Sequence, residues 1–401
     1  MFDGCKLWFI ACLHSYASRP SRVWAARGRP PAKLLRVVGV LSNVEAALTR
    51  SAAAYRSLTP LLLDVVCAIW SDRWGGRNIS RVCRRLRLPS STVTRAIRRL
   101  ERIAQPLTVA IPATMSLGLA RLAVDIEPQP GRTRECFELM VGRPFWQSMA
   151  VCADWHISCF FAVPEKEPKW LTSVLEDAAS RGVLKSYRVI PVCDPIYPPP
   201  RTRLKPGSSE RLNTAPLKPT PPHPTNIESK EDLSRGFDDV DLRLIEQLEL
   251  DGRMSGARIA KTLGLSRAAV STRIRKIIKM RMIGFRLRLL PFPPSESNFF
   301  HTVFEAPTWD ALGELAALIH TLPYTLSYSA SWLSPALVVR SQVPASHTSY
   351  YHDTLSSAVE RGLIRNMLEN RLLVPSTIRN QSVCPEYFVG GLWKTPPLPT
   401  N

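Results

Sequence analysis

Paired cysteines, long apolar runs and nucleotide-binding glycine loops are all missing from this sequence of 401 residues. The nine cysteines are scattered without a Cys-x-x-Cys pair, which argues against a disulfide scaffold or zinc ribbon and favours a cytoplasmic location. No stretch approaches the roughly 20 apolar residues that cross a bilayer, so we expect no membrane partner. Neither a phosphate-binding glycine loop nor a Gly-x-Ser-x-Gly motif occurs, so no cofactor is expected.

Cys152, His156 and Cys159 come nearest to a metal-binding spacing. In a strand, residues 152 and 156 share one face, whereas residue 159 points to the other. No second pair of ligands accompanies them, so the sequence predicts no metal site.

Acidic residues are scarce beside basic ones. Lys and Arg number 53 and Asp and Glu number 33, which gives a formal net charge of +20. Such a surface predicts a polyanionic partner. Double-stranded DNA fits best, because the basic residues concentrate in two helical motifs.

A proline-rich stretch divides the chain into two similar halves, since proline suits neither a helix interior nor a central strand. A shift of 177 residues aligns Leu86 with Leu263 and Val93 with Val270, which indicates an internal duplication. The predicted segments are a basic leader, partly helical or poorly ordered (1–55), a first helix-turn-helix (56–106), a first ferredoxin-like α/β domain (107–193), a Pro-rich linker (194–232), a second, winged helix-turn-helix (233–290), a second ferredoxin-like α/β domain (291–380) and a Pro-rich tail (381–401).

The second half carries the clearer helix-turn-helix. Gly264 suits the positive φ at the end of a short helix, and Ser266 caps the next helix, whose outer face is polar and basic. The strand that follows is expected to form a wing that reaches phosphates. The predicted DNA contacts here are Ser266, Arg267, Ser271, Thr272, Arg273, Arg275 and Lys276, with Arg286 on the wing.

The first half repeats this motif in a weaker form. Arg87 stands where the second half has Gly264, which makes the turn less clear. Arginines nevertheless crowd the segment. The predicted DNA contacts are Ser90, Ser91, Thr94, Arg95, Arg98 and Arg99.

The stretch Asp238 to Phe285 resembles the DNA-binding domain of the Lrp/AsnC family of feast/famine regulators. The matching residues include Asp251-Gly252-Arg253, Leu263-Gly264-Leu265-Ser266 and Arg273-Ile274. The resemblance implies a ferredoxin-like domain for dimerisation and small-molecule sensing. Both halves show the corresponding strand–helix–strand–strand–helix–strand pattern.

The family's effector site lies beside a turn that usually holds a glycine near an acid. This chain has Ala-Asp-Trp at 153–155 and Ala-Ser-Trp at 330–332 instead. The candidate effector contacts are Asp154, Trp155, Ser331 and Trp332. The two tryptophans also fit a core or interface position, and we favour this interpretation because large aromatic side chains commonly anchor interfaces.

The sequence therefore predicts an α+β protein with two tandem copies of a winged helix-turn-helix followed by a ferredoxin-like domain. The expected function is DNA-binding transcriptional regulation without enzymatic activity, with self-association through the α/β domains, within or between chains. Two alternatives remain: an architectural DNA-coating protein, and an enzyme resembling siroheme decarboxylases, which share this fold. The arginine-rich helices and the lack of an evident His/Tyr/Arg constellation in the middle strands argue against the enzyme.

Overall fold

The computed structural model describes residues 58–72, 75–104, 106–167, 169–198, 236–290, 292 and 296–397. The predicted leader (1–55) and most of the predicted linker (194–232) lie outside these residues. Among the helices that are described, none has the length and apolar character needed to span a membrane.

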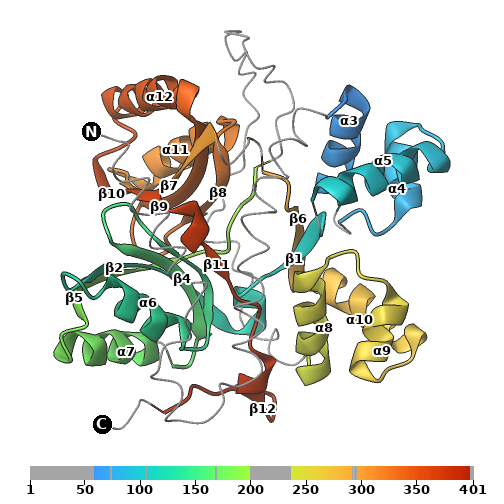
Figure 1. Ribbon diagram of the computed structural model, residues 1–401, viewed down its shortest axis with the longest axis horizontal. Coiled ribbons are helices and arrows are strands. Elements are labelled where there is room, and N and C mark those ends of the chain that lie inside the picture. Colours follow the sequence, from blue (N-terminus) through green and yellow to red (C-terminus); the bar gives the residue numbers. More distant parts are fainter. Residues whose placement is uncertain are drawn as a thin grey trace, which may run out of the picture. The chain divides into compact units, whose positions relative to one another are not determined.

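Three short helices open each half of the chain (Figure 1). The first unit contains α3 (Pro60–Trp70), α4 (Ile79–Leu86) and α5 (Ser90–Ile103), and the second contains α8 (Asp239–Leu250), α9 (Gly256–Leu263) and α10 (Arg267–Lys279). Polar side chains fix where the helices begin: the Asn78 side chain accepts a hydrogen bond from the Arg81 amide at 3.3 Å, and Asp238 forms a capping box with Asp241. Each unit has its own apolar core.

The strand predicted to be a wing pairs instead with the other half of the chain. β6 (Ile283–Leu287) runs antiparallel to β1 (Thr108–Pro112), with Thr108 opposite Leu287. β1 contributes Ala110 to the core of the second helical unit, while Leu287 packs on the core of the first. The wing prediction was therefore wrong, because each strand satisfies its backbone by pairing with the opposite half. This exchange ties the two helical units together.

Each half continues into a sheet with two helices, in the predicted βαββαβ order. The first comprises β2 (Leu119–Pro128), α6 (Thr133–Val141), β3 (Trp146–Val151), β4 (Ile157–Pro164), α7 (Lys169–Ser180) and β5 (Leu184–Val192), and the second β7 (Ser297–Glu305), α11 (Trp309–Thr321), β8 (Thr325–Ala330), β9 (Ala336–Pro344), α12 (Thr348–Glu360) and β10 (Asn366–Leu373). The strand orders are β11-β3-β4-β2-β5 and β10-β7-β9-β8, in which both middle pairs are antiparallel.

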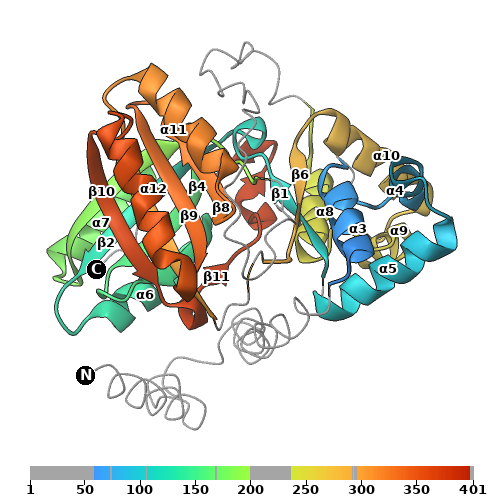
Figure 2. The same cartoon turned by 90° about the horizontal axis from the view of Figure 1, so that it is seen from above.

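The two sheets pack face to face, and their helices cover the outer faces. Helices α11 and α12 share one core with β8 and β9 (Figure 2), and α6 and α7 share another with β3 and β4. A separate apolar cluster joins the inner faces, where Ala123, Phe160 and Val192 of the first sheet meet Val303 and Val338 of the second. Residues from both halves therefore meet at this junction.

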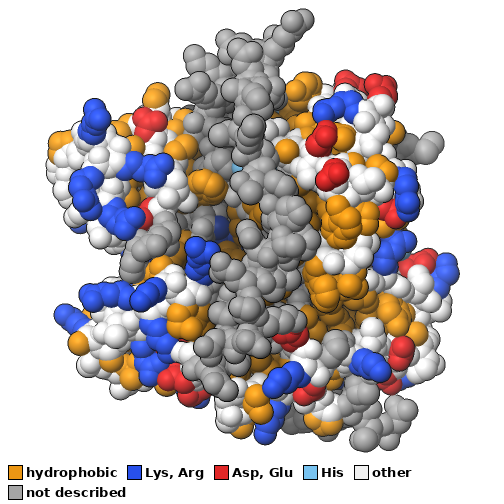
Figure 3. All heavy atoms as spheres, turned by 180° about the vertical axis from the view of Figure 1, so that it is seen from behind, with side chains coloured by type: hydrophobic (Ala, Val, Ile, Leu, Met, Phe, Trp, Pro, Cys, Tyr) orange, Lys and Arg blue, Asp and Glu red, His pale blue; other side chains and the backbone are white. Residues whose placement is uncertain are grey.

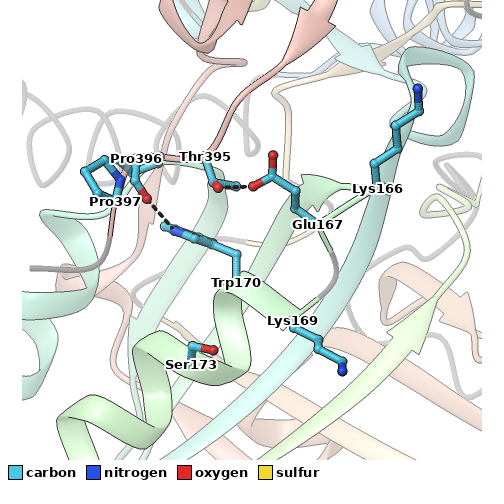
Figure 4. A pocket seen from close by; sticks show the side chains of 8 residues that line it. All are labelled: Lys166, Glu167, Lys169, Trp170, Ser173, Thr395, Pro396 and Pro397. Carbon is cyan, nitrogen blue, oxygen red and sulfur yellow. Dashed lines mark hydrogen bonds between the residues drawn. The ribbon is translucent and has the colours of Figure 1, made fainter.

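The C-terminal segment, predicted as a Pro-rich tail, is folded back as far as Pro397. β11 (Arg379–Asn380) extends the first sheet beside β3, and the indole of Trp393, in β13 (Leu392–Trp393), donates a hydrogen bond to the Leu117 carbonyl at 2.6 Å. Further along, the Trp170 indole donates to the Pro396 carbonyl at 3.1 Å, at the edge of an open cavity of about 560 Å³ (Figure 4). The segment is therefore docked on the first half, where its backbone carbonyl at Pro396 and the indole of Trp393 find hydrogen-bond partners.

Candidate functional site

The outer face of α10 is the first candidate site, and two local features hold this helix in place. Gly264 ends α9 in the left-handed conformation at φ 67°, and the Ser266 hydroxyl accepts a hydrogen bond from the Ala269 amide at 3.1 Å. Val270, Ile274, Ile277 and Ile278 are buried beneath. Because one stripe of α10 is buried, the opposite stripe faces outward.

The first half makes the same turn without glycine. Arg87 ends α4 at φ 54° and ψ 40°, which is the left-handed region that glycine normally occupies. For a residue with a Cβ, this conformation costs about 1–2 kcal/mol. The turn that the sequence left unclear is therefore present, and α5 follows it as α10 follows Gly264.

Four of the residues predicted to contact DNA from α10 are exposed: Arg267, Ser271, Thr272 and Arg275. Ser266 is also exposed, but its hydroxyl caps the helix. In the first unit Ser90, Ser91, Arg95, Arg98 and Arg99 are exposed and Thr94 is half-buried. Figure 3 shows Lys and Arg side chains spread over both helical units, so the basic character found in the sequence lies on the surface.

Two other residues predicted to contact DNA are engaged within the protein. The fully buried carboxylate of Asp241 accepts hydrogen bonds from Arg273 Nη1 at 2.6 Å and from Lys276 Nζ at 2.8 Å. The side-chain hydrogen bond to Asp241 raises the pKa of Arg273. These two cations join α10 to α8 and so support the helix from beneath. Sequence reasoning missed this because the acid lies 32 and 35 residues earlier in the chain.

Arg286, predicted for the wing, is directed toward Tyr197, and its Cζ lies 5.3 Å from the ring centroid. The effector candidates are also dispersed. Asp154 accepts a hydrogen bond from Arg371 of the other half, and the Ser331 hydroxyl accepts one from the Leu333 amide at 3.2 Å. Trp155 and Trp332 occupy the turns after β3 and β8 and are 56% and 41% exposed.

Polar contacts fix the two helical units to each other. The Arg77 guanidinium donates to the carbonyls of Gly252 and Met254 at 2.6 and 2.9 Å, and Arg253 forms an ion pair with Glu101 at 2.7 Å. Both interactions cross from one half to the other. Together with the β1–β6 pair, they hold α5 and α10 in one assembly.

A second candidate site lies at the junction of the two sheets. Arg121 in β2 and Arg340 in β9 place their Cζ atoms 4.1 and 4.7 Å from the Phe160 ring centroid. Each arginine reaches across to the opposite sheet: Arg121 Nη1 donates to Ser329 Oγ at 2.8 Å, and Arg340 Nη1 to Ser148 Oγ at 2.5 Å. We call Arg121, Arg286, Arg340 and Tyr197 the arginine cluster.

His301 completes this junction. Its ring meets Phe160 edge-on at 5.8 Å, its Nε2 lies 3.6 Å from a carboxylate oxygen of the buried Glu369, and burial lowers its pKa. The sequence showed no evident His/Tyr/Arg constellation in the middle strands, and the tertiary structure gathers these residue types mostly from other elements. The residues come from β2, the segment after β5, β6, β7 and β9, which only the packing of the sheets brings together.

Comparison with known proteins bears on the second helical unit. Residues 237–277 match the model of the AsnC-type helix-turn-helix domain. This segment is an AsnC-type helix-turn-helix domain. The resemblance seen in the sequence is thereby confirmed for the second half. The match does not extend to the first helical unit, and no curated protein matches the chain.

The AsnC-type domain is one part of a larger fold that has solved counterparts. The siroheme decarboxylase NirDL aligns over 82% of this chain and 95% of its own, with a TM-score of 0.52 and 11% identity. A transcriptional regulator of Neisseria meningitidis, solved in complex with L-Met, aligns over 37% of this chain and 96% of its own (TM-score 0.31, 15% identity). AsnC of E. coli covers 34% of this chain and 92% of its own (TM-score 0.26, 16% identity).

The NirDL alignment corrects one prediction. The chain was expected not to be an enzyme, partly because arginine-rich helices seemed out of place in a decarboxylase. A siroheme decarboxylase shares the fold over most of both chains, so this fold does not exclude an enzyme. Helix charge alone cannot exclude catalysis.

Proposed function

We propose that the chain is a DNA-binding transcriptional regulator in which α10 enters a major groove. The observation that carries this proposal is the AsnC-type domain whose recognition helix exposes Arg267, Ser271, Thr272 and Arg275 above a buried stripe. Arginine forms bidentate contacts with guanine and phosphate, whereas Ser and Thr reach either bases or phosphates.

We also propose that the first helical unit is a second, diverged copy of the same domain. Arg87 adopts the conformation of Gly264, and α5 exposes Arg95 and Arg98. Because the β1–β6 pair joins the units, both recognition helices would act as the paired helices of a dimer do. They should contact half-sites about one helical turn apart, roughly 10 base pairs, or a multiple of it.

Arg267→Ala with Arg275→Ala tests the proposal. We expect the double variant to bind a selected DNA site at least tenfold more weakly. The slope of log affinity against log salt concentration should fall in magnitude by about 1 for each phosphate that an arginine no longer neutralises. The matched control is Arg361→Ala, which removes an exposed arginine that pairs with Glu314 on the α/β domain. Equal affinities of the double variant and the wild type would refute the role of α10.

A parallel pair of substitutions, Arg95→Ala with Arg98→Ala, tests the first unit. If α5 binds backbone more than bases, the affinity should fall to a similar extent on specific and unrelated DNA. Unchanged affinity for both DNAs would refute a role of the first helical unit in DNA binding. The proposal for α10 would remain intact.

One observation favours a second candidate function, decarboxylation of a polycarboxylate. Buried arginines beside the imidazole of His301 could hold carboxylates, and the fold is one that a siroheme decarboxylase uses. NirDL has also been solved with an iron-uroporphyrin III analogue, so titration of this chain with iron-uroporphyrin III, followed by absorbance, tests this idea. A shifted spectrum that Arg121→Met abolishes supports it, and an unchanged spectrum refutes it.

A further inference from the structure

Arg340 presents an unusual set of buried donors. Its Nη1 donates to Ser148, but Nε and Nη2 are shielded from solvent and have no hydrogen-bond partner. The N–H bonds of Nε and Nη2 lie on one edge of the guanidinium and point in nearly the same direction. That edge is the fork that binds both oxygens of a carboxylate or phosphate. Buried donors without a partner are rare in proteins and call for an explanation.

The charges around this fork are basic. Burial lowers the pKa of Arg340 to about 10, and Arg121, Tyr197 and Arg286 are among the groups that influence it, so the guanidinium remains protonated at neutral pH. Across the part of the chain that the structure describes, no ion pair joins Arg121, Arg286 or Arg340 to a carboxylate. The carboxylate of Asp194 influences the pKa of Arg121 electrostatically, but it accepts a hydrogen bond from the Thr114 amide at 3.0 Å.

We propose that the arginine cluster binds a small organic anion with at least two negative charges, one of its acidic groups taking the Nε and Nη2 fork of Arg340. A buried cation without a counter-charge is unfavourable. An anion bound here would supply that counter-charge to several arginines at once. The ring of Phe160 lies against Arg121 and Arg340, and that of Tyr197 against Arg286, so aromatic rings flank the three guanidiniums.

The cluster joins three parts of the protein. Arg121 belongs to the first sheet, Arg340 to the second, and Arg286 to β6, which pairs with β1 between the helical units. An anion that contacts all three would change the relative free energies of their arrangements. Its effect on DNA affinity rests on the proposed function, whereas binding of the anion does not. The cluster also differs from the effector candidates in the turns after β3 and β8.

The test uses the full chain and two probes, malonate and inorganic phosphate, each compared with NaCl at equal ionic strength. Thermal unfolding should shift upward by several degrees as a probe is added, because a ligand of the folded state stabilises it by mass action. A shift with malonate alone identifies a carboxylate ligand, one with phosphate alone a phosphate ligand, and one with both a general dianion site. No shift with either probe overturns the proposal.

Two substitutions at Arg340 sharpen the result. Arg340→Met removes the charge, and Arg340→Lys keeps the charge but lacks the fork, so both should weaken probe binding by at least about tenfold. Arg361→Met is the control and should keep the full response. If Arg340→Met does not fold, Arg340→Lys decides the matter, and a full response in that variant refutes the fork. DNA affinity is measured separately with and without the probe, so failed DNA binding and failed anion binding remain distinguishable.

Discussion

Asp241→Asn is the substitution that most directly tests how a buried carboxylate holds α10 against α8. The Asp241 side chain is fully buried, caps α8 together with Asp238, and accepts hydrogen bonds from Arg273 and Lys276. The change preserves shape but removes the negative charge that both cations share. Breaking such a buried arrangement typically costs 3–5 kcal/mol, and because both cations keep some access to solvent we expect about 3 kcal/mol.

Hydrogen exchange of the intact chain measures this effect locally. A destabilisation of about 3 kcal/mol corresponds to roughly a hundredfold faster exchange of protected amides, expected in α8 and α10 and not in the sheets. The matched control is Asp239→Asn, next to Asp238 on the same helix, whose carboxylate lies 3.9 Å from Arg243 on the surface. An exposed pair of this kind contributes less than about 1 kcal/mol. If both variants exchange alike, the reasoning about the buried carboxylate is wrong.

Three further predictions follow from the fold. Arg87→Gly should stabilise the chain by about 0.5–1 kcal/mol in thermal unfolding by relieving the left-handed conformation, and Gly264→Ala should destabilise it by about 1 kcal/mol; opposite signs would contradict the assigned turns. Trp393→Ala should lower the free energy of unfolding by about 2 kcal/mol, roughly half the value for a fully buried tryptophan, and make the C-terminal segment sensitive to proteolysis. Equal cleavage rates in the variant and the wild type would argue against docking of this segment on the first half. Burial raises the pKa of Glu249 to about 8 from 4.5, so the folded state binds this proton more tightly and stability should fall as pH rises from about 4.5 to 8; Glu249→Gln should flatten that profile, and an unchanged profile would refute the shift.

Much of the local structure could be predicted from the sequence. Ser266 and Gly264 mark the ends of α10 and α9, and the periodic apolar residues mark the strands and helices of both α/β units, because caps and periodicity depend on neighbouring residues. Even so, Arg87 shows the limit of a local rule. Its left-handed conformation is imposed by the packing of α4 and α5. The free energy of that packing outweighs the conformational cost that makes a non-glycine residue unexpected at this position.

The candidate sites were predicted less completely. The exposed side of α10 follows from helical periodicity, since burying one stripe leaves the other outside. The roles of Arg273 and Lys276 do not, because a basic side chain on a basic helix gives no sign that an acid from another helix lies within hydrogen-bonding distance. Arg286 was assigned to a wing because a strand follows the helix. The sequence does not show that this strand pairs with β1 or that the guanidinium lies against Tyr197.

The sequence by itself determined the element order, the cap of α10 and the excess of positive charge, all of which are properties of short segments or of composition. Only the tertiary structure decided which strand pairs with β6, which cations are neutralised and which are left without a counter-charge. Arg121 and Arg340 lie 219 residues apart in the chain, yet they share the ring of Phe160. The long-range contacts that bury them are stabilised by the apolar faces of two sheets, which carry no short-range signal of which partner they will meet.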